Sequence, residues 1–465
     1  MLLRFFRIND PYRLLGLLII ATAISVPLFV SPSGMLLTEI KNSVLGQAIA
    51  DGQLMYVQVF DDTPPLAAAL FGFVDLIFGR SIVAQHILAL LLIIFQASYF
   101  AVLLINNKAY AENTYLPCLV FGLLCFFSFD LLSFSPELIA STLLLFALNQ
   151  LFHEIEFKIQ RDDIVLKLGT YLGLATFVIF SYWIFLLVAI IILIVFTRAG
   201  FRKIALVVFG FLLPHLLLLT FYFYKSDLPL LWTNFYKSNL TFSGEMLVSA
   251  KGIVILASVP LAYFVFSIFM MNREARFTKY QSQLMQVMFL WLITSLVQIF
   301  MAQEVSPASF FTFVPPLAYF ISHYLLLIRR KWRAELMLWL FVIGTVGFSY
   351  YTRAGKVESV DYSKLFSQNE IPQLIGKKVM HLGNGYGIYQ GNELGGYFLN
   401  WNLSRPILEN AERYRNVEIV ASCFNEYPPD VVVDEENSLD DFFERIPSLQ
   451  SNYRREGNLY YRISN

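Results

Sequence analysis

Four acidic residues could do acid–base chemistry in a chain that is otherwise strongly apolar. Asp61 and Asp62 are adjacent, Glu39 precedes them in the same polar segment, and Glu137 opens a later apolar stretch. A carboxylate beside apolar membrane is costly, about 2.5–3.5 kcal/mol at the bilayer centre and less near its edge. One reason to keep such a group is catalysis, because a carboxylate can take the proton of a hydroxyl nucleophile.

Helix capping is the alternative explanation for the same acids. Asp61 and Asp62 precede Pro64 and Pro65, either of which suits the first turn of a helix, where a carboxylate meets the positive end of the helix dipole. Glu137 follows Pro136 at another expected helix start. Capping is expected to account for at least one of the two aspartates. Capping by itself could also explain Glu137.

Cations in the same polar segments could bind a phosphate group, although lysines in such loops are often only solvated surface residues. The candidates are Lys41, Arg80, Lys225 and Lys237. No two of the five histidines have metal-ligand spacing, so no zinc site is expected. A divalent cation held by Glu137 stays an open alternative. The glycines of "LGNGYGIYQGNELGG" lack nucleotide-loop spacing and indicate turns.

The elements that must position these residues are membrane spans. The chain is 57% hydrophobic and 15% charged, against roughly 25% charged in a soluble domain. Long apolar runs predict an α-helical polytopic membrane protein with about eleven spans. A turn at "FSYW" divides one run that is too long for a single span. The expected spans are Tyr12–Val30, Ser81–Ile105, Leu116–Leu132, Glu137–Phe152, Leu168–Phe180, Trp183–Phe196, Ile204–Tyr224, Ile253–Met271, Leu284–Met301, Phe311–Ile328 and Leu336–Tyr350.

Basic residues predict the orientation of these spans. With a cytoplasmic N-terminus, the inner loops hold about 17 Lys and Arg and the outer loops about 5, which is the bias expected of inner loops. The odd number of expected spans then places the C-terminal tail on the outer side of the membrane. The net charge is zero, so no nucleic-acid partner is expected.

Two outer regions complete the expected organisation. The transmembrane domain, 1–351, contains a first outer loop at 31–80 whose part "PPLAAALFGFVDLIFG" is too short to span and predicts an interfacial helix. The tail, 352–465, has the composition of a soluble domain. Its strands "KKVMHL" and "DVVVD" and its helix "SLDDFFERIPSL" predict a small α/β periplasmic domain.

The segment "TEIKNSVLGQAIADGQLMYVQVFDDTPPL" resembles the first outer loop of bacterial GT-C-fold glycosyltransferases, which include protein O-mannosyltransferases and aminoarabinose transferases. Glu39, Gly52, Tyr56 and 64–66 match that family's glutamate, glycine, tyrosine and Pro-Pro-Leu. "SPASFFTFVPPLAYFISHYLL" is similar to a late span, and "PPDVVVD" and "LQSNYRREGNLYYRIS" to the end of the periplasmic domain.

This resemblance implies an inverting transfer of a sugar from a polyprenyl-phosphate donor to an envelope acceptor at the outer face of the membrane. Glu39 is the first choice for the base and Asp61 or Asp62 the second. Glu137 would position the acceptor. Thr38, however, stands where the family has an aspartate, and a threonine hydroxyl cannot act as a base near neutral pH.

Two other hypotheses therefore stay open. The first is a non-catalytic GT-C-like membrane scaffold that binds lipid or assembles the envelope. The second is a transporter, for which ionisable residues in mid-span would be the signature. Convergence of the candidate acids would favour the enzyme, and separate capping of each acid would favour the scaffold.

Overall fold

The computed structural model describes residues 1–30, 34–156, 161–241, 244–366 and 374–463. The start of the expected first outer loop, 31–33, lies outside the described residues, as do 367–373 and 464–465 of the tail. The chain forms two compact units. The membrane unit comprises Met1–Ser33, Val83–Leu218 and Phe242–Lys364, and the loop–tail unit comprises Gly34–Ile82, Leu219–Thr241 and Leu365–Asn465. The domain limits 1–351 and 352–465 stay a prediction.

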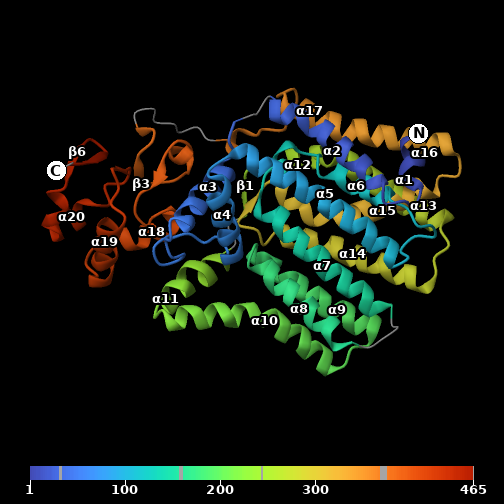
Figure 1. Ribbon diagram of the computed structural model, residues 1–465, viewed down its shortest axis with the longest axis horizontal. Coiled ribbons are helices and arrows are strands. Elements are labelled where there is room, and N and C mark those ends of the chain that lie inside the picture. Colours follow the sequence, from blue (N-terminus) through green and yellow to red (C-terminus); the bar gives the residue numbers. More distant parts are fainter. Residues whose placement is uncertain (31–33, 157–160, 242–243, 367–373, 464–465) are drawn as a thin grey trace. The chain divides into compact units, whose positions relative to one another are not determined.

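Eight helices among the described residues are long and apolar enough to cross a membrane (Figure 1). A ninth is added if α12 (Ala250–Leu256) and α13 (Ser258–Glu274), which are bent by 60°, form one span. The eight are α2 (Arg13–Val30), α5 (Ile82–Asn106), α7 (Pro136–Ile155), η2 with α9 (Phe180–Thr197), α10 (Phe201–Tyr224), α14 (Lys279–Ile299), η4 with α15 (Pro307–Leu327) and α16 through α17 (Lys331–Arg353). The protein is a multi-pass membrane protein.

Two of the eleven expected spans form shorter helices. The helix α6 (Leu116–Leu124) has nine residues, and α8 (Asp162–Thr176) has fifteen. After α6 the chain turns into the 3-10 segment η1 (Phe129–Leu132), where side chains bond locally. Ser128 donates to the carboxylate of Asp130, and such local bonds compete with helical ones. The expected break at "FSYW" is confirmed as the 3-10 turn η2 (Phe180–Trp183).

Glycines bring α8 and α10 into close contact within the membrane unit. A Cβ added at Gly169 would overlap the backbone carbonyl of Val207, and one at Gly173 would overlap that of Phe211. Gly210 faces the carbonyl of Leu166 from the other helix in the same way. Small residues spaced four apart are a common means of packing helices in a membrane, because they let two backbones approach.

In the loop–tail unit, α3 (Leu37–Ala50) and α4 (Pro65–Phe78) pack side by side (Figure 1). The helix α4 begins with Pro65, one of the two prolines expected in its first turn. Its N-cap residue is Pro64 and no side chain caps it, so the expected cap by Asp61 or Asp62 is not formed. The helix is apolar but, at 14 residues, too short to span. Its position at a membrane interface stays a prediction. The segment 228–237 adds the short helix α11 (Leu228–Leu231) and the π-helix η3 (Trp232–Lys237).

The tail folds into a five-stranded mixed sheet of order β4-β3-β5-β7-β6. The strands β4 and β5 pair parallel to β3, whereas β7 pairs antiparallel to β5 and β6. The expected small α/β domain is thus present. Its elements are β3 (Lys378–Leu382), β4 (Glu393–Leu394), β5 (Val431–Asp434), β6 (Tyr453–Glu456), β7 (Leu459–Arg462), α18 (Trp401–Leu408), α19 (Tyr414–Glu426), α20 (Asp440–Arg445) and α21 (Pro447–Gln450).

The first outer loop is part of this domain's core. Phe60 is fully buried with Met380 and Val432 of the sheet, and its ring stacks on that of Phe398 at 5.5 Å. The amide of Phe60 donates to the carbonyl of Tyr397 (2.7 Å), and its carbonyl accepts from the amide of Asn400 (2.9 Å). Phe60 therefore fixes the backbone that leads directly into Asp61 and Asp62.

Candidate functional site

A tight loop before the two aspartates holds its shape through a buried tyrosine. Tyr56 has a φ of 67°, a left-handed conformation that is uncommon outside glycine. Its hydroxyl donates to the carbonyl of Thr63 (2.8 Å), and its ring stacks on Phe235 at 5.5 Å. The side-chain amide of Asn234 donates to the carbonyl of Tyr56 (2.8 Å). A residue in such a strained conformation is kept only where several neighbouring contacts hold it there. Strained residues of this kind are concentrated at functional sites.

Lys41 joins both aspartates. Its Nζ lies 3.1 Å from Oδ1 of Asp61 and 3.3 Å from Oδ1 of Asp62. The side chain of Asp61 is 0% exposed, whereas those of Asp62 and Lys41 are 15% and 19% exposed. The ammonium also lies over the ring of Tyr386, 5.6 Å from its centroid. Only Asp62 and Lys41 can therefore meet a solute without rearrangement.

Asp61 is the enclosed member of this cluster. One of its carboxylate oxygens accepts from the amide of Thr63 (3.1 Å) and from the Thr63 hydroxyl. Burial raises the pKa of Asp61, and the charge of Lys41 counteracts that rise. The contact to the Thr63 amide is an Asx turn, a pattern that the sequence "DDT" could have indicated.

Asp62 is the accessible member and receives donors from two distant segments. Its carboxylate accepts from Asn400 Nδ2 (3.2 Å) and Ser238 Oγ (3.3 Å) as well as from Lys41. Its backbone carbonyl accepts from Asn239 Nδ2 (2.8 Å). Sequence reasoning missed Asn400, Ser238 and Asn239, because residues up to 338 positions away leave no local signal.

Glu39 caps the start of α3. Its Oε2 accepts from the backbone amide of Leu36 (3.0 Å), and the side chain is buried. Glu39 and Lys41 are two positions apart on α3, which is a rotation of about 200° and places them on different faces of that helix. Helix capping therefore explains the position of the Glu39 carboxylate, one of whose oxygens accepts the Leu36 amide.

The other candidate cations of the loop–tail unit differ in their surroundings. Arg80 donates to the backbone carbonyls of Tyr389 and Asn392, and burial lowers the pKa of its guanidinium. Lys225 and Lys237 are exposed. Lys237 ends η3 and directly precedes Ser238, which contacts Asp62.

Glu137 belongs to the membrane unit, whereas the other candidate residues belong to the loop–tail unit. It is the second residue of α7, after Pro136, and the helix is capped by Ser135, whose hydroxyl accepts from the amide of Leu138 (3.3 Å). The structure therefore brings Lys41, Asp61 and Asp62 together, and a role for Glu137 beside them stays a prediction.

The donor set suits a lysine better than a metal ion. Within the described ranges, no three His, Cys, Asp or Glu side chains are grouped to hold a metal. A cation that bridged Asp61 and Asp62 would have to displace the ammonium of Lys41 from both carboxylates. The cluster instead places an accessible carboxylate, Asp62, beside a fixed ammonium group, which is an arrangement suited to proton abstraction.

Comparison of the fold with solved structures found similar architectures. ArnT from Cupriavidus metallidurans bound to undecaprenyl phosphate has a TM-score of 0.58 at 11% identity, over 97% of this chain and 98% of that one. ArnT in the apo state gives 0.58 and 11%, over 96% and 97%. An Archaeoglobus fulgidus oligosaccharyltransferase tethered to an acceptor peptide gives 0.52 and 10%, over 98% and 74%.

No family model and no curated protein matches the chain. At these identities the likeness establishes the architecture. The chain has the ArnT-like, GT-C fold of a polytopic membrane protein, as the sequence resemblance predicted.

Proposed function

We propose that this protein transfers a sugar from a polyprenyl-phosphate donor to an envelope acceptor at the outer face of a bacterial inner membrane. The observation that carries the proposal is the fold, which this chain shares over nearly its whole length with a protein solved with undecaprenyl phosphate bound. The excess of Lys and Arg in one set of loops supports a cytoplasmic N-terminus and a periplasmic tail.

Asp62 is the carboxylate that geometry favours as the base. It is more exposed than Asp61 and, unlike Glu39, is not part of a helix cap. Asp62 would remove the proton of the acceptor hydroxyl as that oxygen bonds to the anomeric carbon. The bond from this carbon to the phosphate oxygen breaks on the opposite side, and the lipid phosphate leaves with the electron pair.

Cations at the same surface would stabilise the leaving phosphate. Lys41 and Arg80 already contact protein oxygens, whereas Lys225 and Lys237 are exposed. Lys237 is the first choice, because its neighbour Ser238 bonds to Asp62. Glu137 stays the candidate that positions the acceptor or holds a divalent cation.

The test is genetic and chemical together. Deletion of the gene is expected to remove a glycan or glycolipid from the envelope, and wild-type protein is expected to restore it. The Asp62→Asn variant should fail to restore it, whereas Asp51→Asn, which changes an exposed acid after α3, should succeed. Glu39→Gln tests the first choice from the sequence. Equal rescue by all variants would remove these acids from the mechanism.

A non-catalytic scaffold is the second candidate function, and Thr38 favours it, since no carboxylate stands at that position. Purified protein in nanodiscs separates the two. A scaffold would bind polyprenyl phosphate without turnover of any polyprenyl-phosphate sugar, and Asp62→Asn would leave its cellular role intact.

A further inference from the structure

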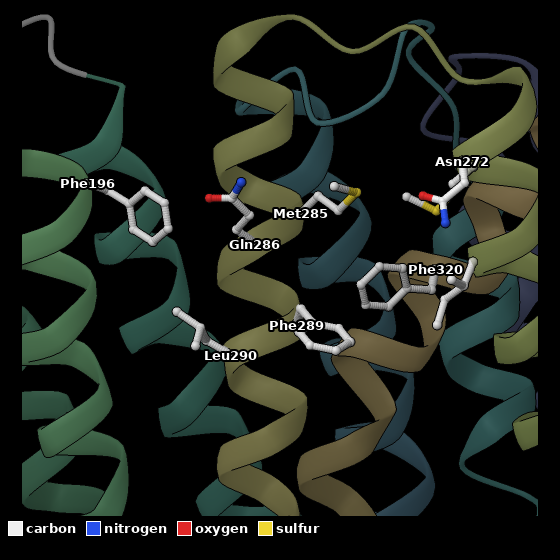
Figure 2. A pocket seen from close by; sticks show the side chains of 9 residues that line it. Phe196, Asn272, Met285, Gln286, Phe289, Leu290 and Phe320 are labelled. Carbon is white, nitrogen blue, oxygen red and sulfur yellow. The ribbon is translucent and has the colours of Figure 1, made fainter.

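A cleft opens between spans of the membrane unit, far in sequence from the acidic cluster. It is lined by α9 (Ile184–Thr197), α13, α14 and α15 and has a volume of about 430 Å³ (Figure 2). Cavities of roughly 300–1,000 Å³ are the usual size of small-molecule sites. None of its lining residues has a role in the proposed transfer.

The cleft has an apolar end and a polar end. Phe289 and Phe320 lie at the end farther from the connection between α13 and α14, and Phe320 is buried whereas Phe289 is exposed (Figure 2). Asn272 and Gln286 lie at the end nearer the connection between α13 and α14, on either side of Met285. An aliphatic chain fits the apolar part, because it buries its methylene groups without leaving polar groups unpaired.

Gln286 is the unexpected residue on this surface. It is exposed on α14 seven positions after Lys279, the first helical residue, which is about 10 Å along the helix axis. An amide exposed at that depth in hydrocarbon is costly unless it finds a hydrogen-bond partner. The ester and glycerol oxygens of a phospholipid lie at this depth below the headgroup and would supply one.

Unpaired positive charge surrounds the polar end of the cleft. Arg273 follows Asn272 directly, Arg276 lies in the connection to α14, and Arg198 follows α9 two residues after Phe196. With Lys279 they make four exposed cations, and none is within ion-pair distance of a carboxylate among the residues that the structure describes.

Other basic residues near these helix ends are neutralised. Lys203 pairs with Glu154, Arg202 with Asp162, and Arg329 with Glu274 at 2.7 Å. These pairs leave Arg198, Arg273, Arg276 and Lys279 as the exposed cations next to the residues that line the cleft. Their charge complements an anionic headgroup at the membrane surface.

We propose that this cleft binds one anionic phospholipid from the leaflet that faces the α13–α14 connection. An acyl chain lies between Phe289 and Phe320, the glycerol ester region contacts Asn272 and Gln286, and the phosphate lies among Arg273, Arg276 and Lys279. The site is independent of the proposed function, since it uses neither the acidic cluster nor a polyprenyl donor.

The test is lipid binding to the full chain in nanodiscs of dioleoyl phosphatidylcholine. Added dioleoyl phosphatidylglycerol should bind saturably, read as a rise in Tm and as retained lipid in native mass spectrometry. The Arg273→Gln/Arg276→Gln variant should bind it about thirtyfold more weakly, as expected for two lost cations at a membrane surface. Arg330→Gln/Lys331→Gln, which removes two exposed cations from another connection, should bind it like the wild type.

A cavity-filling variant tests the acyl site separately. Met285→Trp should abolish retention of phosphatidylglycerol while the protein still elutes as a folded species, because the bulky ring occupies the cleft. Inorganic phosphate at equal phosphate concentration should not raise Tm. Equal stabilisation by inorganic phosphate, equal binding of phosphatidylcholine, or identical retention by all variants would overturn the proposal.

Discussion

The loop around Asp61 and the contact between α8 and α10 are held together by opposite means. The loop depends on polar side chains, since Lys41, Thr63 and Asn400 all bond to Asp61 or Asp62. The helix pair depends on the lack of side chains at Gly169 and Gly173.

The two regions differ because one packs within lipid and the other is surrounded by water. Lipid tails are as apolar as leucine, so helices in a bilayer gain by close backbone approach rather than by exclusion of water. Where water competes for every hydrogen bond, buried and mutually paired polar groups define one conformation of a loop. Substitutions in the two regions should therefore fail for different reasons and respond differently to pH.

The largest effect is expected in the helix pair. Gly173→Leu places a side chain where the carbonyl of Phe211 lies, so α8 must move away from α10. We expect a loss of about 3 kcal/mol in unfolding free energy. Unfolding in mixed detergent micelles measures it, with Gly200→Ala as the control, because a Cβ at Gly200 meets no atom. Wild-type stability of Gly173→Leu would contradict the close packing.

Removal of the cation in the loop should come second. Lys41→Met leaves the buried Asp61 beside Asp62 with no opposing charge, and we expect a loss of about 2 kcal/mol near neutral pH. Thermal unfolding followed by tryptophan fluorescence measures it, with Lys251→Met, an exposed lysine, as the control. The double variant Lys41→Met/Asp61→Asn should recover much of the loss, and an additive result would mean that the pair does not interact.

The pH dependence separates the two regions. Burial raises the pKa of Asp61 above its ordinary value of 3.8, and loss of Lys41 removes the charge that counteracts this rise. For a carboxyl with a raised folded-state pKa, stability is fully present below the unfolded pKa and is lost as pH rises through the folded one.

The deficit of Lys41→Met relative to the wild type should therefore shrink as pH falls from about 7 towards about 4. The deficit of Gly173→Leu should stay constant, since no charge lies at that contact. Parallel curves for both variants would mean that the Lys41 deficit is not electrostatic.

The smallest expected effect concerns the strained loop. Tyr56→Phe removes the hydroxyl that donates to Thr63, and we expect a loss of about 1 kcal/mol. Tyr414→Phe, at an exposed position, is the matched control for thermal unfolding. An unchanged Tm of Tyr56→Phe would show that ring stacking on Phe235 and the bond from Asn234 hold the loop without the hydroxyl.

Sequence reasoning found the features that have local signals. The pair Pro64 and Pro65 indicated the start of α4, "FSYW" indicated the break before α9, and the runs at 377–382 and 430–434 indicated two strands. In each case the signal lies within the segment itself: a proline that fits a first helical turn, an apolar run too long for one span, or a short apolar run.

The features that were missed depend on distant residues or on local competition. Asn400 and Ser238 reach Asp62 only through the tertiary fold. The short helix α6 ends where serine and aspartate side chains bond locally, although hydropathy favours a longer span there. The spacing of Gly169 and Gly173 could have predicted close packing, but it does not identify α10 as the partner.

The hydrogen bonds around Asp62 cannot all form until the tail has been synthesised. Asp62 leaves the ribosome early, whereas Asn400 follows 338 residues later. All membrane helices are therefore inserted before the polar cluster can close around Asp62. A chain truncated before the tail would lack Asn400 and with it one of the hydrogen-bond donors to Asp62.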